Sequence, residues 1–291
     1  MAKVAMVGVG RMGAAMAARM IGAGHDVTLY NRTRARADEF AAEHGGTVAA
    51  TAAEAAAAVR GGTVLVSLAD DRAVETVYTG PDGLVSGLRP DTVVLEMSTV
   101  APETVRRLAQ PIADRGATLL DAPVSGSVPV VQRGELTVLV GGDQVALDRA
   151  RPALDSFAGK VFHLGGLGAG ATVKLAVNSI IHALNQAVSE ALVLAERAGV
   201  DRAAAYEVFA ASAVGAPFLH YKQQAFLHPE DTPVAFSLEL AAKDLELIGA
   251  LAEQVGARMA LTEAGRELMR EAIAAGYGER DFSVLAEVLR R

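Results

Sequence analysis

Short apolar runs alternate with longer amphipathic segments over the first 163 residues of the chain. The runs are typical of strands buried on both faces, and the segments between them carry apolar residues at helical spacing. We predict strands at 4–7, 27–30, 64–67, 93–96, 118–122, 136–141 and 160–163, and helices at 12–21, 35–43, 52–59, 73–78 and 103–115. This order predicts a doubly wound α/β domain with a mostly parallel sheet.

The pattern changes after a glycine-rich stretch at residues 165–170. Residues 171–198 contain neither Gly nor Pro and predict one helix of about 28 residues, roughly 40 Å long at 1.5 Å per residue. The rest is helical in pattern, with start signals at Asp201 and Thr262 and stop signals at Gly215, Gly256 and Gly276. We therefore expect an α/β domain at residues 1–165 and an all-α domain at residues 166–291.

The first predicted strand runs into the turn VGVGRMG, in which Gly8, Gly10 and Gly13 have the spacing G-x-G-x-x-G. Gly8 permits a tight bend, Gly10 lets phosphates approach the backbone, and Gly13 lets helix and strand pack closely. The helix N-terminus adds free N–H groups, so the turn predicts a dinucleotide-binding Rossmann domain. Cofactor contacts are expected from Gly8, Val9, Gly10, Arg11, Met12 and Gly13.

The residues after the second strand predict which nicotinamide cofactor is preferred. An Asp or Glu there would bind the ribose 2′-hydroxyl of NAD and repel a 2′-phosphate. The chain has Asn31, Arg32 and Thr33 instead, and a guanidinium beside an amide and a hydroxyl suits a phosphate dianion. We therefore predict NADP. A solvated basic helix face is the alternative interpretation, and it suits Arg34 and Arg36 best.

Other strand ends predict further cofactor contacts, because ligands of such sheets bind beyond the carboxyl ends of the strands. Leu68 and Ala69 follow the third predicted strand, and Thr99 follows the fourth. We expect these residues to help hold the cofactor.

Two more groups of residues carry candidate chemistry. The loop DAPVSGS, residues 121–127, can aim backbone N–H groups and a hydroxyl at an anion, although such loops are also common as structural features. Lys174 and Asn178 stand four residues apart on one face of the long helix, among apolar residues. Such a lysine either meets a ligand or extends to solvent, and the residues alone leave both open.

Composition narrows the class of protein. The chain has no cysteine, which excludes disulfides and thiolate chemistry, and its six histidines lack ligand spacing, so we expect no metal. The net charge of −7 argues against a nucleic-acid partner. No apolar run reaches the length of a membrane span, and the N-terminus is a strand instead of a signal peptide. We expect a cytoplasmic enzyme with no membrane contact.

The motifs, in this order, resemble those of the β-hydroxyacid dehydrogenases, the family of 3-hydroxyisobutyrate dehydrogenase, tartronate semialdehyde reductase and the glyoxylate/succinic semialdehyde reductases. The resemblance covers essentially the whole chain and includes VGVGRMG, DAPVSG followed by GELTVLVGG, GAGATVKLAVN, KDLELIGALAEQVG and GYGERDFSVL. It implies a Rossmann domain, a long interdomain helix and an all-helical domain that commonly forms the oligomer interface.

The resemblance also implies roles for individual residues. Lys174 matches the family's catalytic lysine, and Asn178 matches its substrate-orienting asparagine. Ser125 and Gly126 would bind the substrate carboxylate. Thr99 would lie near the nicotinamide, and Lys243 of the KDL motif would reach cofactor and substrate. Asp281, in the D-x-S pattern, would make a structural contact.

Some positions depart from the family pattern and leave the exact substrate open. Ser127, in the substrate-binding loop, replaces the usual second glycine, and Val130 and Val131 replace an expected Gly-Ala, so we expect a bulkier loop. Val177 replaces a frequent asparagine, as it often does among the semialdehyde and glyoxylate reductases. Ala101 replaces a customary serine.

The activity implied is reversible hydride transfer between NADP(H) and a small 3-oxo acid, 2-oxo acid or aldehyde acid, with Lys174 as general acid and base. The substrate is therefore expected to carry a carboxylate. An NADPH-dependent imine reductase of the same fold is one alternative, although those enzymes typically have Asp or Tyr in place of the lysine. A catalytically silent NADP-binding protein is another, and the intact Lys174 and Asn178 count against it.

The long helix also suggests self-association. Leu184, Val188 and Leu192 are expected to remain available for packing against another subunit. We predict a homodimer or homotetramer.

Overall fold

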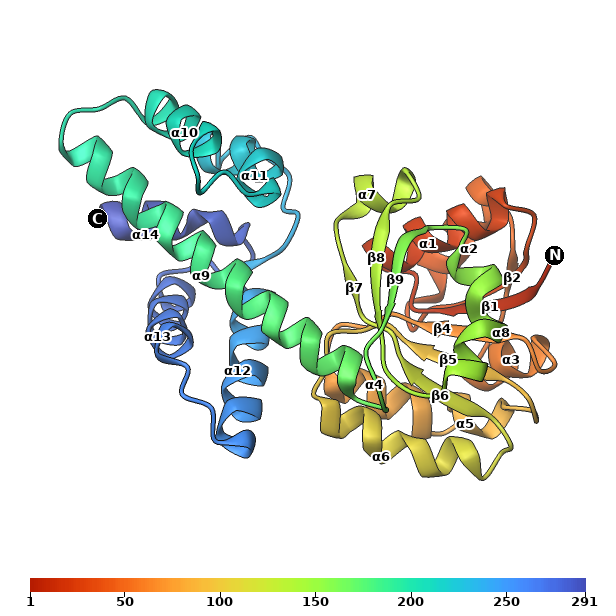
Figure 1. The fold of residues 1–291 in the computed structure, drawn as a ribbon. Coiled ribbons are helices and arrows are strands. Elements are labelled where there is room, and N and C mark those ends of the chain that lie inside the picture. The colour runs from red at the N-terminus through yellow and green to blue at the C-terminus, as the bar shows by residue number, and fades with distance from the viewer. The chain divides into compact units, whose positions relative to one another are not determined.

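A computed structural model describes residues 1–291, which form two compact units, Met1–Lys174 and Leu175–Arg291. The first unit contains a six-stranded sheet in the order β3-β2-β1-β4-β5-β6, and every neighbouring pair is parallel (Figure 1). Its strands are β1 (Lys3–Val7), β2 (Asp26–Tyr30), β3 (Thr47–Val48), β4 (Thr63–Val66), β5 (Val93–Glu96) and β6 (Thr118–Asp121). This is the predicted doubly wound Rossmann fold.

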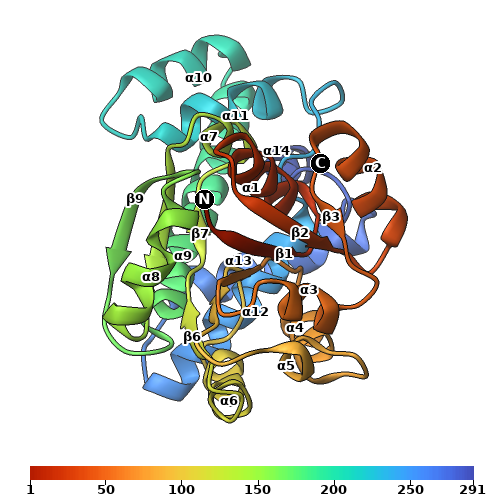
Figure 2. The ribbon, with the colours of Figure 1, turned by 90° about the vertical axis from the view of Figure 1, so that its right-hand side faces the viewer.

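Helices cover both faces of this sheet because its strands are apolar on both sides. Along β1, Val4 and Met6 join one core cluster, whereas Ala5 and Val7 join the other. The first face is covered by α1 (Arg11–Gly22), α2 (Arg34–His44) and α8 (Gln144–Leu154). The opposite face is covered by α3 (Ala52–Ala58), α4 (Asp71–Thr79), α5 (Leu84–Gly87) and α6 (Pro102–Ala113) (Figure 2). Burial on both faces explains the continuous apolar runs in the sequence.

A second, smaller sheet follows, which the sequence did not predict. It contains β7 (Val124–Ser125), β8 (Leu136–Val140) and β9 (Ala158–His163), in that order, with β7 antiparallel to β8. The last two strands were expected in the main sheet. The short helix α7 (Val128–Gln132) lies between β7 and β8 in the chain. The sequence pattern could find strands but not their partners, because pairing is decided by packing.

The second unit is helical. It begins within α9 (Ala169–Arg197) and continues with α10 (Arg202–Ala211), α11 (Pro217–Leu227), α12 (Leu238–Val255), α13 (Ala260–Ala274), the single 3₁₀ turn η1 (Phe282–Val284) and α14 (Leu285–Arg290). Asp201 caps α10 and Gly256 ends α12 in the left-handed conformation, as predicted. The start signal assigned to Thr262 was wrong, since Thr262 lies inside α13. Gly215 lies four residues beyond the end of α10.

Two of the long-helix residues expected to face another subunit are buried within the chain itself. Val188 and Leu192 are 4% and 0% exposed and belong to the core of the second unit, and Leu184 packs against that core. That expectation was wrong. The exposed apolar side chains on helices of this unit include Ile180, Leu194 and Val208. None of the helices in the structure combines the length and apolar character needed to cross a membrane.

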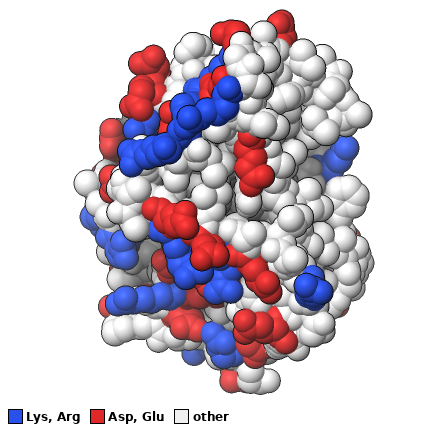
Figure 3. All heavy atoms as spheres, turned by 90° about the vertical axis from the view of Figure 1, so that its left-hand side faces the viewer, with Lys and Arg blue, Asp and Glu red and all other residues white.

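Several charged side chains on the second unit meet opposite charges. Arg202 pairs with Glu196 and Glu287, and Arg266 pairs with Glu246. Figure 3 shows one face of the molecule, on which basic and acidic side chains lie beside one another with uncharged areas between them. That face presents no extended surface of a single charge.

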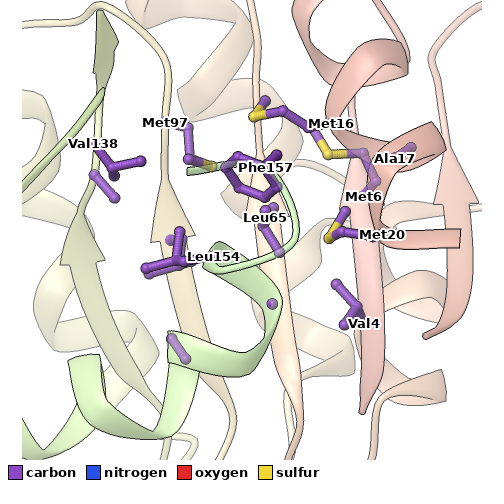
Figure 4. Packing of buried hydrophobic residues seen from close by; sticks show 14 of the residues in the cluster. Val4, Met6, Met16, Ala17, Met20, Leu65, Met97, Val138, Leu154 and Phe157 are labelled. Carbon is purple, nitrogen blue, oxygen red and sulfur yellow. The ribbon is translucent and has the colours of Figure 1, made fainter. Parts of the chain in front are cut away.

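The core under α1 joins the two sheets of the first unit. Phe157, which precedes β9 and is fully buried, lies among Met6, Met16 and Met97, while Val138 contributes from β8 (Figure 4). Methionines have flexible, polarisable side chains that fill irregular gaps. The small sheet is therefore part of the same core as the dinucleotide-binding sheet, and β7 with its loop is held firmly beside it.

One carboxylate of this unit is buried without a cation. Glu96 ends β5 and is fully buried; its Oε1 accepts a hydrogen bond from the backbone N–H of Ser98 at 2.8 Å, whereas Oε2 has no hydrogen-bond partner. Burial raises the pKa of Glu96 to about 7, although the contacts with Ser98 oppose the shift. Glu96 is therefore protonated in the folded chain at mildly acidic pH.

This shift predicts how stability depends on pH. Because the pKa of Glu96 is raised on folding, its contribution to the free energy of unfolding is fully present below pH 4.5 and is lost as pH rises to about 7. Replacing Glu96 by Gln keeps an acceptor for Ser98 and removes the charge. We expect Glu96→Gln to be more stable than the parent at pH 8, by on the order of 3 kcal/mol, and equally stable at pH 4.5 in urea denaturation.

The exposed Glu39 provides the control. Glu39→Gln should leave the stability difference between pH 4.5 and pH 8 unchanged. A Glu96→Gln variant whose stability tracked that of the parent at both pH values would show that the buried carboxyl does not govern the pH dependence.

Candidate functional site

The glycine turn after β1 has the form that a pyrophosphate requires. Gly8 has φ +97°, and a Cβ there would collide with the carbonyl oxygen of Ser67; a Cβ at Gly13 would collide with that of Gly8. At Gly10, by contrast, a Cβ would meet nothing within 4 Å. Gly10 caps α1 without any side-chain hydrogen bond. The N–H groups of Met12 and Gly13 lie in the first turn of α1, ahead of any intrahelical acceptor, and fit an anion.

Asn31 links this turn to the loop after β2. Its Oδ1 accepts a hydrogen bond from the N–H of Val9 at 3.1 Å, and its Nδ2 donates to the carbonyl of Thr33 at 2.9 Å. Arg32 between them is exposed, and Thr33 occupies the cap of α2 without a side-chain cap bond. Arg34 pairs with Asp38 on the same helix at 3.4 Å. The structure therefore gives Asn31 an organising contact and leaves Arg32 at the tip of the loop.

The loops after β4 and β5 are joined by a serine. Ser98 Oγ accepts a hydrogen bond from the N–H of Leu68 at 2.8 Å, and Ser98 is itself held by Glu96. Ala69 is exposed and Thr99 is partly exposed in these loops. Because β1, β4 and β5 are neighbours in a parallel sheet, the glycine turn, Leu68, Ala69 and Thr99 all lie at one edge of it.

The loop that carries Ser125, Gly126 and Ser127 is braced by the small sheet. Ser125 pairs with Thr137 of β8, Gly126 has φ +141°, and Ser127 caps α7. A Cβ at Gly126 would lie 2.9 Å from Leu136 Cδ1. The bulk of Val130 and Val131 goes into the core, since Val131 is fully buried and Val130 packs on the same cluster.

Lys174 lies at the start of α9, where a buried carboxylate holds the helix. Asp121, at the end of β6, accepts hydrogen bonds from the N–H groups of Gly168 and Ala171, each at 2.7 Å. Burial raises the pKa of Asp121, and these backbone donors oppose the shift. Lys174 follows Ala171 by three residues, so it lies about one turn further along the same helix.

Asn178, one turn beyond Lys174, contacts a buried aspartate of α12. Its Nδ2 donates to Asp244 Oδ2 at 2.6 Å; His182 Nε2 lies 3.7 Å from the same oxygen, and Lys243 Nζ lies 2.9 Å from Oδ1. Burial would raise the pKa of Asp244, but His182 and Lys243 outweigh it and hold the pKa below its usual value. Asp244 therefore remains ionised and orients the Asn178 amide.

Sequence reasoning missed Asp121, Asp244 and His182. Asp121 lies in the motif DAPVSG and Asp244 in the motif KDL. Each motif thus contains an aspartate to which no role was assigned, and this could have indicated a structural contact. His182 continues the four-residue spacing of Lys174 and Asn178. Asp281 makes the structural contact that was expected: both its carboxylate oxygens lie 2.7 Å from Nζ of the buried Lys222.

Comparison with known proteins agrees with this architecture. Residues 3–165 match the NAD binding domain of 6-phosphogluconate dehydrogenase, and residues 168–289 match the NAD-binding region of NADP-dependent 3-hydroxyisobutyrate dehydrogenase. Together these matches span nearly the whole chain.

Individual relatives match over their full length. The chain is 32% identical to an NAD-dependent L-serine dehydrogenase of Pseudomonas aeruginosa, over 99% of this chain and 98% of that protein. It is 31% identical to glyoxylate/succinic semialdehyde reductase 1 of Arabidopsis thaliana, over 99% and 98%. The structure of Mycobacterium tuberculosis 3-hydroxyisobutyrate dehydrogenase with L-serine matches with a TM-score of 0.85 and 31% identity over 100% of both chains. The chain therefore belongs to the β-hydroxyacid dehydrogenase family of pyridine-nucleotide-dependent oxidoreductases.

Proposed function

We propose that the protein is an NADP-dependent oxidoreductase that interconverts a small β-hydroxy acid with its semialdehyde, or a 2-hydroxy acid with its 2-oxo acid. The observation that carries this proposal is that a glycine turn without a side-chain cap, a braced serine loop and the lysine-bearing start of α9 all belong to the first unit. In the division of labour we propose, residues 1–165 bind the nucleotide and residues 166–291 contribute to substrate binding and assembly.

The cofactor would be held by the loops at the sheet edge. The N–H groups of Arg11, Met12 and Gly13 would bind the pyrophosphate, and Leu68, Ala69 and Thr99 would contact the nicotinamide half. When bound, the reduced nicotinamide supplies a hydride to the substrate carbonyl carbon. Lys243 remains a proposed cofactor-binding residue.

The substrate would be oriented by its carboxylate and its carbonyl oxygen. Ser125, Gly126 and Ser127 would hold the carboxylate, which fixes the face of the carbonyl that is attacked. Protonated Lys174 would stabilise the negative charge that grows on the carbonyl oxygen and deliver the proton, and its neutral amine would act as base in oxidation. Asn178 would donate to the same oxygen or hold the lysine in line, with Asp244 fixing its amide.

The preference for NADP is proposed from Arg32. Its exposed guanidinium stands at the loop tip after β2, where a 2′-phosphate would lie, and no acidic residue occupies positions 31–33. Because one relative is NAD-dependent by name, cofactor preference varies within this family and must be measured for this chain.

A charge reversal tests the cofactor preference. We expect NADPH to bind at least about tenfold more tightly than NADH, and Arg32→Asp to erase or reverse that difference, because it places a repulsive charge near the 2′-phosphate. Fluorescence titration measures both affinities. Arg36→Asp, on the exposed face of α2, is the matched control and should change the ratio little. Equal affinities of the unmodified protein for NADPH and NADH would contradict the proposal.

Removal of the lysine tests the chemistry. Lys174→Ala should lower kcat by about 10² to 10⁴, the range typical of general acid catalysis, and leave NADPH affinity nearly unchanged. Lys174→Arg should restore little, because a guanidinium stays protonated and cannot exchange the proton in both directions. Steady-state rates with glyoxylate, succinic semialdehyde and other short aldehyde acids provide the measurement. Retention of more than roughly a tenth of the parent rate by Lys174→Ala would refute the assignment.

The same substrate panel separates the alternatives. An imine reductase would consume NADPH with cyclic imines and not with aldehyde acids, and a silent binding protein would bind NADPH and turn over neither. The presence of Lys174, where imine reductases typically have Asp or Tyr, favours carbonyl reduction.

We also propose self-association, on a different surface from the one first expected. Ile180, Leu194 and Val208 are between 65% and 73% exposed, and apolar side chains of this size are usually covered when several lie on one unit. A homodimer or larger assembly is expected. Light scattering at micromolar concentration measures the mass, and a monomer would contradict this prediction.

A further inference from the structure

We propose that Asp121 is a positioning residue for the reaction: its buried carboxylate fixes the start of α9 and thereby the place of Lys174. The inference rests on the proposed function, because it assigns Asp121 to the same site. Asp121 belongs to the first unit together with Lys174 and the loop of Ser125.

Asp121 holds the first turn of α9 through both of its carboxylate oxygens. Oδ1 accepts from the N–H of Gly168 and Oδ2 accepts from that of Ala171, both at 2.7 Å, so one carboxylate holds two donors that the helix cannot satisfy itself. Two bonds to one rigid group define both the height and the rotation of the helix. The side chain is fully buried, so water does not compete for these donors.

The backbone of Asp121 is fixed as firmly as its side chain. Its N–H donates to the carbonyl of Gly141 at 3.2 Å, and its carbonyl accepts from the N–H of Gly141 at 2.8 Å. Asp121 therefore ties the end of the main sheet to the end of β8 and to α9 at once. Four residues further along the chain, Ser125 is paired with β8. The proposed carboxylate-binding loop and the proposed acid are thus located from a single residue.

Glycines around Asp121 allow the close approach. A Cβ on Gly141 would collide with Asp121 Oδ1, and a Cβ on Gly170 would lie 3.0 Å from Oδ2 and collide with the carbonyl of Leu139. A larger residue at either position would therefore displace the carboxylate. Gly141 and Gly170 are thus the two glycines that the close approach to Asp121 requires.

The charge of Asp121 also bears on Lys174. An anion at the N-terminus of a helix offsets the positive end of the helix dipole, which would otherwise disfavour a cation in the next turn. Asp121 thus both places Lys174 and supports its protonated form, which the general acid must have before it delivers a proton.

Asp121→Asn tests this inference, because the amide keeps the size but loses the charge and presents N–H to one of the two donors. We expect kcat to fall about tenfold or more, NADPH affinity to stay within about threefold, and the alkaline limb of the reduction rate to move to lower pH. Asp143→Asn is the matched control. Asp143 caps α8 in the same unit through the N–H of Ala146 at 2.8 Å, so its exchange for Asn removes the charge of another capping carboxylate without touching α9.

A second readout does not require catalysis. The pH dependence of Lys174 acetylation by acetic anhydride, followed by peptide mass spectrometry with Lys160 as internal reference, measures how readily the amine loses its proton. Asp121→Asn should shift Lys174 labelling to lower pH, and Asp143→Asn should not. If both variants show the same kcat and the same labelling profile as the parent, or if both change alike, the inference is wrong.

The two proposals can fail separately. A parent protein that reduces no aldehyde acid with NADPH would overturn the proposed function, while the labelling profile would still decide the influence of Asp121 on Lys174. If Asp121→Asn does not fold, Gly170→Ala replaces it, since its Cβ would collide with the carbonyl of Leu139 and crowd Asp121 Oδ2, which shifts the start of α9 while the carboxylate keeps its charge. A tenfold loss of kcat at unchanged NADPH affinity would support the inference, and an unchanged kcat would overturn it.

Discussion

The unsatisfied N–H groups at helix N-termini are the constraint on which this structure depends. Every helix begins with donors that need an acceptor, and the first unit solves this in two opposite ways. At α1 the capping residue is Gly10, which offers no side chain to accept from these donors. At α9 the buried carboxylate of Asp121 takes the donors of Gly168 and Ala171. The start of α9 is thereby held by a side chain of the same unit, whereas the start of α1 has no side-chain cap.

The buried acids of the two units differ in their partners and in the direction of their pKa shifts. Glu96 and Asp121, in the first unit, are held by backbone donors, and burial raises the pKa of each. Asp244 and Asp281, in the second unit, have lysine partners. Burial would raise the pKa of each, but the net shift is downward, because Lys243 and His182 act on Asp244 and Lys222 acts on Asp281. Glu96 and Asp121 thus bind backbone N–H groups at the sheet edge, whereas Asp244 and Asp281 form ion pairs with side chains.

The substrate loop shows how a departure from a family pattern can be misread. Val130 and Val131 add bulk to a loop expected to face a small substrate, and the structure turns that bulk toward the core. Only Ser127 remains a substitution in the part of the loop that carries Ser125 and Gly126. Ser127 is therefore the departure that lies beside the proposed carboxylate-binding residues.

The main strands, the glycine turn, the long helix and the residues along it could all be predicted from the sequence. These follow from hydrophobic periodicity and from the conformations that glycine permits, both of which act over a few residues. It could not assign β8 and β9 to their own sheet, bury Val188 and Leu192 in the chain's own core, or join Asp121 to α9 and Asp244 to Asn178. Those contacts link residues 47 to 66 positions apart or depend on which surfaces pack together. They arise when the chain packs, because the free energy of burial and of satisfied buried donors is a property of the assembled core and not of any single segment.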